Sequence, residues 1–199
     1  KFNKTISVES DKSISHRALL IASQCIGVSN INNILESEDV KNTIICLKKL
    51  GVRIIKKNKK YIVYGNGLGS FKKPKNNFLY AGNSGTLARM IFALLGTQSN
   101  LKVKISGDSS LNKRDMKRII DPLTKIGCNF YPKNKTTLPL TIEGTSMPLA
   151  QKHLEKIGSA QVKSSILLAA LNTQGTTQVE GKKISRDHTE NLLSKIKAD

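Results

Sequence analysis

The sequence has no tryptophan, few acidic side chains and no long apolar segment among its 199 residues. No apolar run approaches the roughly 18 residues that a membrane-spanning helix needs. The first four residues, KFNK, lead into a strand-like segment rather than a signal peptide. We therefore expect neither a membrane segment nor secretion, and we expect a cytoplasmic location.

Cysteine is also scarce. The chain has an odd number of cysteines, without the spacing of metal ligands, in apolar surroundings at Cys25, Cys46 and Cys128. Free cysteine behaves as a small apolar side chain, so we expect reduced, buried thiols. The pattern indicates neither a disulfide framework nor a metal site, and we expect no cofactor.

The shortage of acidic residues leaves a formal net charge of +19, from 33 lysines and arginines against 14 aspartates and glutamates. Such a charge attracts phosphates without regard to sequence, as in nucleic-acid-binding proteins. However, 27 of the basic residues are lysines scattered through the chain, with no zinc pattern and no aromatic RNA-binding signature. The dense run KKNKK at 56–60 falls at an expected hairpin turn. We expect no nucleic-acid partner, and keep a basic nucleic-acid-binding protein as the alternative from another class.

Hydrophobic periodicity predicts three rounds of similar elements. The first round has helices over 16–25 and 39–50 and strands over 29–35, 52–56 and 61–64. The second has helices over 84–95 and 115–126 and strands over 101–106, 128–132 and 138–143. The third has helices over 160–171 and 187–197 and a strand over 176–179. A leading strand precedes each round, at 4–8, 77–80 and about 153–157.

Matching landmarks indicate that these rounds are copies of one unit. Gly51 and Gly127 each follow a second helix, where a C-cap glycine belongs. Asp39, Asp115 and Asp187 open the second helices, at intervals of 76 and 72 residues. A period of this length is typical of a supersecondary repeat. The sequence therefore predicts a mixed α/β (α+β) fold of three βαβαββ units, over about 13–66, 76–145 and 150–199, the third truncated before its last two strands.

The first helix of each round is apolar on nearly every side and must be buried. These segments read ALLIA at 18–22, MIFALL at 90–95 and ILLAAL at 166–171. We expect outer sheets packed around the three interior helices. The N-termini of those helices should converge on one face of the molecule.

Hydroxyls and fixed cations stand where the buried helices begin. The stretch KSISHR at 12–17 precedes the first, NSGT at 83–86 with Arg89 the second, and SAQVK at 159–163 the third. Arg114 and Arg186 stand at the starts of second helices. A helix N-terminus with such residues suits a phosphate or a carboxylate.

A simpler reading of each motif needs no ligand. Ser13 or Ser15 could be an ordinary N-cap, and the cations could belong to a solvated face. Five such helix starts at equivalent positions of a repeat favour an anion-binding site over this reading.

Together the motifs resemble the 5-enolpyruvylshikimate-3-phosphate synthase family, in the family's order and spacing over nearly all of the chain. The motifs are KSISHR, GNSGTLAR, GDSSLNKRDM, GSAQVKSSILLAALNT and SRDHTENLL. The last two are similar to the branch with SAQVKS and TRDHTE rather than the branch with SSQ. The resemblance implies transfer of the enolpyruvyl group of phosphoenolpyruvate to shikimate 3-phosphate, a step of aromatic amino acid biosynthesis. It also implies an enolpyruvyl transferase-like fold of two domains, each with three βαβαββ units.

The resemblance also assigns roles to residues. It makes Lys12 a catalytic residue in contact with both substrates. The phosphoenolpyruvate pocket would be lined by Lys12, Gly85, Arg114 and Gln161. Shikimate 3-phosphate would be held by Lys12, Ser13, Arg17, Ser159, Ala160, Gln161 and Arg186, with its carboxylate on Ser13 and Arg17. Asn83 and Thr86 are second choices.

The chain departs from the family in two ways. The family usually has Arg-Pro-Met where this chain has Arg114-Asp115-Met116, and we expect little harm because Asp can still start a helix. The family is also about twice as long, and its second domain supplies the carboxylates for proton transfer. We therefore expect an incomplete fragment without activity of its own: 1–12 as leading strand and hinge toward that second domain, and 13–199 as a substrate-binding domain. The full-length enzyme should be monomeric.

The alternative within the same class is UDP-N-acetylglucosamine enolpyruvyl transferase, which shares the fold. That enzyme would have an asparagine after the first lysine, and usually a cysteine in the loop before the middle arginine. This chain has Ser13 at the first position and Ser109-Ser110 in the loop.

Overall fold

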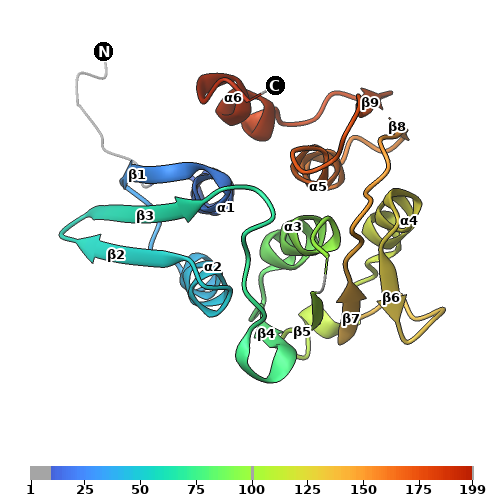
Figure 1. The fold of residues 1–199 in the computed structure, drawn as a ribbon, viewed down its shortest axis with the longest axis horizontal. Helices are drawn as coiled ribbons and strands as arrows, with labels where there is room; N and C mark the ends of the chain where they lie inside the picture. Colours follow the sequence, from blue (N-terminus) through green and yellow to red (C-terminus); the bar gives the residue numbers. More distant parts are fainter. Residues whose placement is uncertain (1–9, 100, 199) are drawn as a thin grey trace, which may run out of the picture.

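The structure is a computed structural model that describes residues 10–99 and 101–198, and its elements fall into three groups (Figure 1). The first group is α1 (Lys12–Gln24), β1 (Ile26–Asn32), α2 (Glu38–Lys49), β2 (Arg53–Lys57) and β3 (Lys60–Asn66). The second is β4 (Phe78–Tyr80), α3 (Gly85–Gly96), β5 (Lys102–Ser106), α4 (Lys117–Ile126), β6 (Asn129–Tyr131) and β7 (Leu140–Glu143), with short 3-10 turns at Lys75–Asn77 and Leu111–Lys113. The third is β8 (Lys152–Glu155), α5 (Ala160–Ala170), β9 (Gln178–Gly181) and α6 (His188–Lys195).

Strand pairing repeats between the groups. In the second group the order is β4-β5-β7-β6, with β4 parallel to β5 and the other neighbours antiparallel. The first group has the antiparallel order β1-β3-β2, and the third has β8 parallel to β9. Strands β1, β5 and β9 thus hold equivalent places, which confirms the mixed α/β fold built from a repeat. The leading strand expected at 4–8 lies outside the described residues.

Helices α1, α3 and α5 lie in the middle of the molecule, with the sheets outside them (Figure 1). Helix α3 packs against both α1 and α5. Every residue of α3 except Thr86 and Arg89 is buried. This burial confirms the prediction for α3, because an apolar helix contributes most to stability when all its faces leave water. Helix α5 is less enclosed than predicted, since Leu167 is only partly buried.

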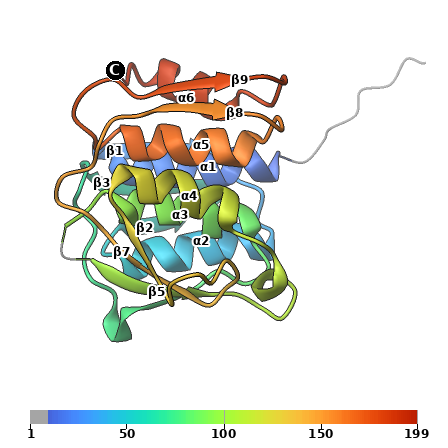
Figure 2. The same ribbon diagram turned by 90° about the vertical axis from the view of Figure 1, so that its right-hand side faces the viewer.

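The axes of the three central helices lie side by side in Figure 2, and hydrogen bonds at their ends show that the helices run in the same direction. At one end, Ser84 before α3 contacts His16 of α1, and Thr86 contacts Gln161 of α5. At the other end, Asn172 after α5 donates to the carbonyl oxygen of Thr97 after α3. The N-termini of α1, α3 and α5 therefore converge on one face, as predicted.

The start of α1 differs from the prediction. The helix begins at Lys12, because Asp11 is its N-cap and accepts a hydrogen bond from the Ile14 N–H at 2.7 Å. Neither Ser13 nor Ser15 caps it. The KSISHR stretch forms the first turns of the helix rather than the segment before it. Its side chains therefore point in several directions around the helix axis, toward different neighbouring elements.

Other boundaries moved for local reasons. Strand β1 ends at Asn32, before Asn33 with a φ of 53°, whereas the sequence predicted a strand over 29–35. Of the three aspartates expected to open second helices, only Asp187 is an N-cap; Asp39 lies inside α2, and Asp115 precedes α4. The hairpin turn between β2 and β3 and the left-handed C-cap at Gly127 are confirmed.

Two sequence-level expectations concern burial and membrane insertion. Cys46 and Cys128 are buried free thiols, whereas Cys25 is only partly buried. In the described ranges, no helix is long and apolar enough to cross a membrane.

Candidate functional site

A pocket of about 420 Å³ opens where the N-termini of α1 and α5 meet the segment before α6. Six residues predicted to bind one ligand line it: Ser13, Arg17, Ser159, Ala160, Gln161 and Arg186. Gly158, Ile184, Ser185 and His188 complete the wall. Residues more than 140 positions apart in the chain are thus brought to one place.

Arg17 is the buried cation of this pocket, with 2% of its surface exposed. Its Nε donates to Thr189 Oγ1 at 2.8 Å, Nη1 to the Ser13 carbonyl at 3.0 Å, and Nη2 to Ser164 Oγ at 2.9 Å. Burial lowers the pKa of Arg17, since desolvation disfavours the charged form. A guanidinium stays protonated at neutral pH even so, and a desolvated cation favours an anionic ligand.

The start of α5 forms the second wall. Ser159 is its N-cap, with Oγ accepting from the Val162 N–H at 3.4 Å. The loop before it turns at Gly158, whose φ is 82°. The buried carboxylate of Glu155 accepts from the N–H groups of Gly158 and of Ser159, the latter at 2.9 Å. Glu155 fixes this loop, and sequence reasoning missed it because nothing local shows which amides a carboxylate will bind.

Gln161 links this pocket to the N-terminus of α3. Its Oε1 accepts from Arg89 Nη1 at 2.8 Å, and its Nε2 donates to Thr86 Oγ1 at 3.0 Å. Arg89 and Thr86 are the two residues of α3 that are not buried. The amide therefore joins two groups of predicted binding residues, and one of its partners, Arg89, had been assigned no role.

A second cationic cluster surrounds Gly85. Arg114 Nη2 donates to Asn83 Oδ1 at 2.7 Å, and Asn83 Nδ2 donates to Asp108 Oδ2 at 2.7 Å. A Cβ added at Gly85 would lie 2.6 Å from Arg89 Nη1 and 3.3 Å from Arg114 Nη1. Two guanidiniums thus converge on the helix start at a residue without a side chain. The arrangement suits an anion approaching the backbone of α3.

Partial burial and the neighbouring positive charges both lower the pKa of Arg89. Its pKa is lowered first by desolvation and then by Arg114 and Arg118. The crowding of like charges has an energetic cost that a bound anion would relieve.

Lys12 does not line the pocket of Ser13 and Arg17. It faces α2 instead, where its Nζ lies 2.9 Å from Asp39 Oδ2. Half of the Lys12 side chain is exposed, so this ion pair is weak and exchangeable. Lys12 is therefore absent from the lining formed by the other six residues that the resemblance assigned to shikimate 3-phosphate.

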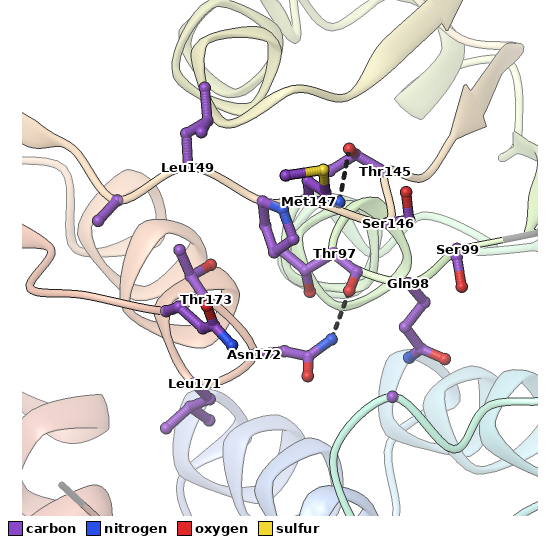
Figure 3. A pocket seen from close by; sticks show the side chains of 14 residues that line it. Thr97, Gln98, Ser99, Thr145, Ser146, Met147, Leu149, Leu171, Asn172 and Thr173 are labelled. Carbon is purple, nitrogen blue, oxygen red and sulfur yellow. Dashed lines mark hydrogen bonds between the residues drawn. The ribbon is translucent and has the colours of Figure 1, made fainter.

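A larger cavity, of about 750 Å³, lies at the opposite ends of the central helices (Figure 3). It is lined by uncharged residues that include Thr97 after α3 and Asn172 after α5. Helix C-termini carry partial negative charge, which disfavours an anion there. None of the predicted binding residues lines this cavity. The smaller pocket at the N-termini is the better candidate for an anionic ligand.

Comparisons with known proteins identify relatives of this chain. A family model described as EPSP synthase (3-phosphoshikimate 1-carboxyvinyltransferase) matches residues 1–199. The 3-phosphoshikimate 1-carboxyvinyltransferase of Petrotoga mobilis is 46% identical over 201 residues, which cover 99% of this chain and 46% of that protein. The 3-phosphoshikimate 1-carboxyvinyltransferase of Bartonella quintana is 41% identical over 197 residues, which cover 98% of this chain and 43% of that protein.

Solved structures give the same result. EPSP synthase from Acinetobacter baumannii matches with a TM-score of 0.89 and 36% identity, over 95% of this chain and 42% of that one. The chain thus spans somewhat less than half the length of the relatives it matches.

Proposed function

This chain belongs to the EPSP synthase (3-phosphoshikimate 1-carboxyvinyltransferase) family, and from that premise we propose that it contributes a substrate-binding half to enolpyruvyl transfer. The reaction moves the enolpyruvyl group of phosphoenolpyruvate to shikimate 3-phosphate, and yields 5-enolpyruvylshikimate 3-phosphate and phosphate. It belongs to the shikimate pathway of aromatic amino acid biosynthesis. The observation that carries the proposal is the single pocket lined by six of the seven residues assigned to shikimate 3-phosphate.

The proposed pose gives each anionic group of shikimate 3-phosphate a cation. The carboxylate lies on Arg17 and Ser13, where the buried guanidinium keeps two of its five N–H donors after its three hydrogen bonds. The phosphate lies at the start of α5, on Ser159 and the Ala160 N–H, with the exposed Arg186 opposite. Charge-assisted bonds and the helix N-terminus both favour this placement.

Phosphoenolpyruvate would occupy the neighbouring cluster at Gly85, between Arg114 and Gln161. The close approach of Arg89 and Arg114 to Gly85 supports this placement. Gln161 would then contact both substrates, since it lines one site and hydrogen-bonds to the other. Fixed cations let two polyanions lie side by side, which is the orientation that the transfer requires.

Lys12 remains the proposed catalytic cation. Its ammonium group is already paired with Asp39, so contact with a substrate would require exchange of that partner. The weak pair of an exposed lysine permits such an exchange.

Calorimetric titration of the 199-residue chain tests the proposal. We expect shikimate 3-phosphate to bind, and unphosphorylated shikimate to bind at least about tenfold more weakly because it lacks the dianion. Arg186→Ala should lower the affinity for shikimate 3-phosphate by about tenfold. The matched control Arg53→Ala removes the same charge from β2, where Arg53 stacks on Tyr64, and should change affinity less than twofold.

The same titration distinguishes the alternatives. UDP-N-acetylglucosamine binding without shikimate 3-phosphate binding would favour the other enolpyruvyl transferase. Tight, salt-dependent binding of random duplex DNA that shikimate 3-phosphate does not displace would favour a nucleic-acid-binding protein. Either result would refute the proposal.

A further inference from the structure

One edge of the Arg17 guanidinium is held by two hydroxyls. Nε donates to Thr189 Oγ1 at 2.8 Å and Nη2 donates to Ser164 Oγ at 2.9 Å. Thr189 Oγ1 donates in turn to Ser164 Oγ at 2.7 Å, and Ser164 donates to the Ala160 carbonyl at 2.6 Å. The guanidinium edge and the two hydroxyls therefore form a closed ring in which every proton has an acceptor.

This ring joins three elements that wall the pocket. Arg17 lies on α1, Ser164 on α5 and Thr189 on α6. All three are buried, with exposures of 2%, 1% and 0%. Because the site is buried, removal of one hydroxyl leaves an N–H of the guanidinium without an acceptor and weakens the control of its orientation.

The choice of hydroxyls has an electrostatic consequence. In the described part of the chain, no ion pair within 4.0 Å joins Arg17 to a carboxylate. Two carboxylates raise the pKa of Arg17 without an ion pair to it: Glu190, which is paired with Lys163, and to a smaller extent Asp11. A carboxylate partner would orient the guanidinium but would also neutralise it. Hydroxyls orient it and leave its charge for a ligand.

We propose that Thr189 and Ser164 are positioning residues that aim Arg17 at the anionic group of the bound substrate. Thr189 lies three residues after Arg186, so the same ring fixes the segment that carries the second cation of the pocket. This inference deepens the proposed function and rests on it. It assigns a role to the threonine of the SRDHTE stretch, which does not itself line the pocket.

A pair of variants tests the role of the Thr189 hydroxyl. Thr189→Val keeps the volume and removes the hydroxyl, whereas Thr189→Ser keeps the hydroxyl and serves as the rescue. We expect Thr189→Val to lower the affinity for shikimate 3-phosphate by about tenfold, and the affinity of Thr189→Ser to stay within about twofold of that of the original chain. Ser164→Ala removes the other hydroxyl and should also weaken binding of shikimate 3-phosphate. This variant tests the proposal if Thr189→Val does not fold.

Hydrogen exchange of the Arg17 Nε–H, followed by NMR, separates this role from general destabilisation, which would speed exchange throughout the chain rather than at this proton alone. This proton should exchange slowly in the original chain and in Thr189→Ser, and quickly in Thr189→Val, while backbone amides of α3 keep their protection. Unchanged exchange of the Nε–H, or unchanged affinity in a folded Thr189→Val, would overturn the proposal. If the original chain does not bind shikimate 3-phosphate, the proposed function fails, whereas selective loss of Nε–H protection would still support the orienting ring. The two failures are therefore distinguishable.

Discussion

Acid should destabilise this chain through His16, the residue beside Arg17 in the first turns of α1. His16 is fully buried, with Nδ1 2.7 Å from Thr43 Oγ1 and Nε2 3.3 Å from Ser84 Oγ. Thr43 Oγ1 also donates to the Asp39 carbonyl at 3.4 Å. A neutral imidazole fits this chain of contacts, with one nitrogen donating and the other accepting. Its ring thus links α1 to α2 and to the N-cap of α3.

Burial lowers the pKa of His16 from 6.5 to about 4, against a smaller opposing effect of Asp39, while Lys12 and Arg17 lower it further. In the unfolded chain the imidazole takes up a proton near pH 6.5, and in the folded chain only near pH 4. Between these values the unfolded state binds more protons. The free energy of unfolding must therefore fall as the pH drops from about 6.5 to about 4, by about 3 kcal/mol.

Urea unfolding at pH 7.5 and pH 4.0 measures this loss. His16→Gln cannot titrate, so the stability difference between the original chain and this variant should shrink by about 3 kcal/mol between the two pH values. Carboxylates such as Glu36 and Asp108, whose pKa values are lowered by hydrogen bonds in the folded chain, titrate equally in both proteins and cancel. His153→Gln is the control, and its half-buried site should give a smaller change. Parallel stability curves, or an NMR pKa of His16 near 6.5, would refute the reasoning.

Three further results are expected. Phe92→Ala should cost about 3–5 kcal/mol in urea unfolding, because Phe92 is a fully buried side chain of α3; a loss below about 1 kcal/mol would mean that the site collapses or is looser than the structure has it. Burial raises the pKa of Cys46 to about 11 and of Cys128 to about 12, so both should resist iodoacetamide in native buffer until urea is added, with Cys25 modified first in mass spectra. In a full-length context Arg114→Ala should lower the affinity for phosphoenolpyruvate by about tenfold and the affinity for shikimate 3-phosphate much less. An equal loss of affinity for both ligands would contradict the separate placement of the two substrates.

The repeat could be predicted from the sequence because its signals are local. A glycine that ends a helix, as Gly127 does, and an apolar helix such as α3 are visible within a dozen residues. The start of α1 was missed because Asp11, Ser13 and Ser15 are all acceptable caps, and the choice depends on contacts elsewhere. Ser15, for example, accepts a hydrogen bond from the Leu35 N–H, which a helix-start pattern does not reveal.

The predicted ligand residues came from motifs, whereas their partners depend on packing between distant elements. Arg17 is oriented by Ser164 and Thr189, which lie 147 and 172 residues further along the chain. The pairing of Lys12 with Asp39 likewise depends on how α2 packs against α1. Motif spacing predicts which side chains lie near one another. Which of their atoms face a ligand depends on how the helices pack.

Chemical-shift mapping of the 199-residue chain with shikimate 3-phosphate tests the central claim most directly. We predict saturable shifts concentrated at the amides of 13–17, 158–161 and 185–188, around the pocket of Arg17 and Arg186. Amides of 97–99 and 171–174, around the larger cavity of Figure 3, should stay unchanged. Shifts centred on that larger cavity, shifts spread over the surface lysines, or no saturable shifts at all would contradict the claim that the converging helix N-termini form the substrate site.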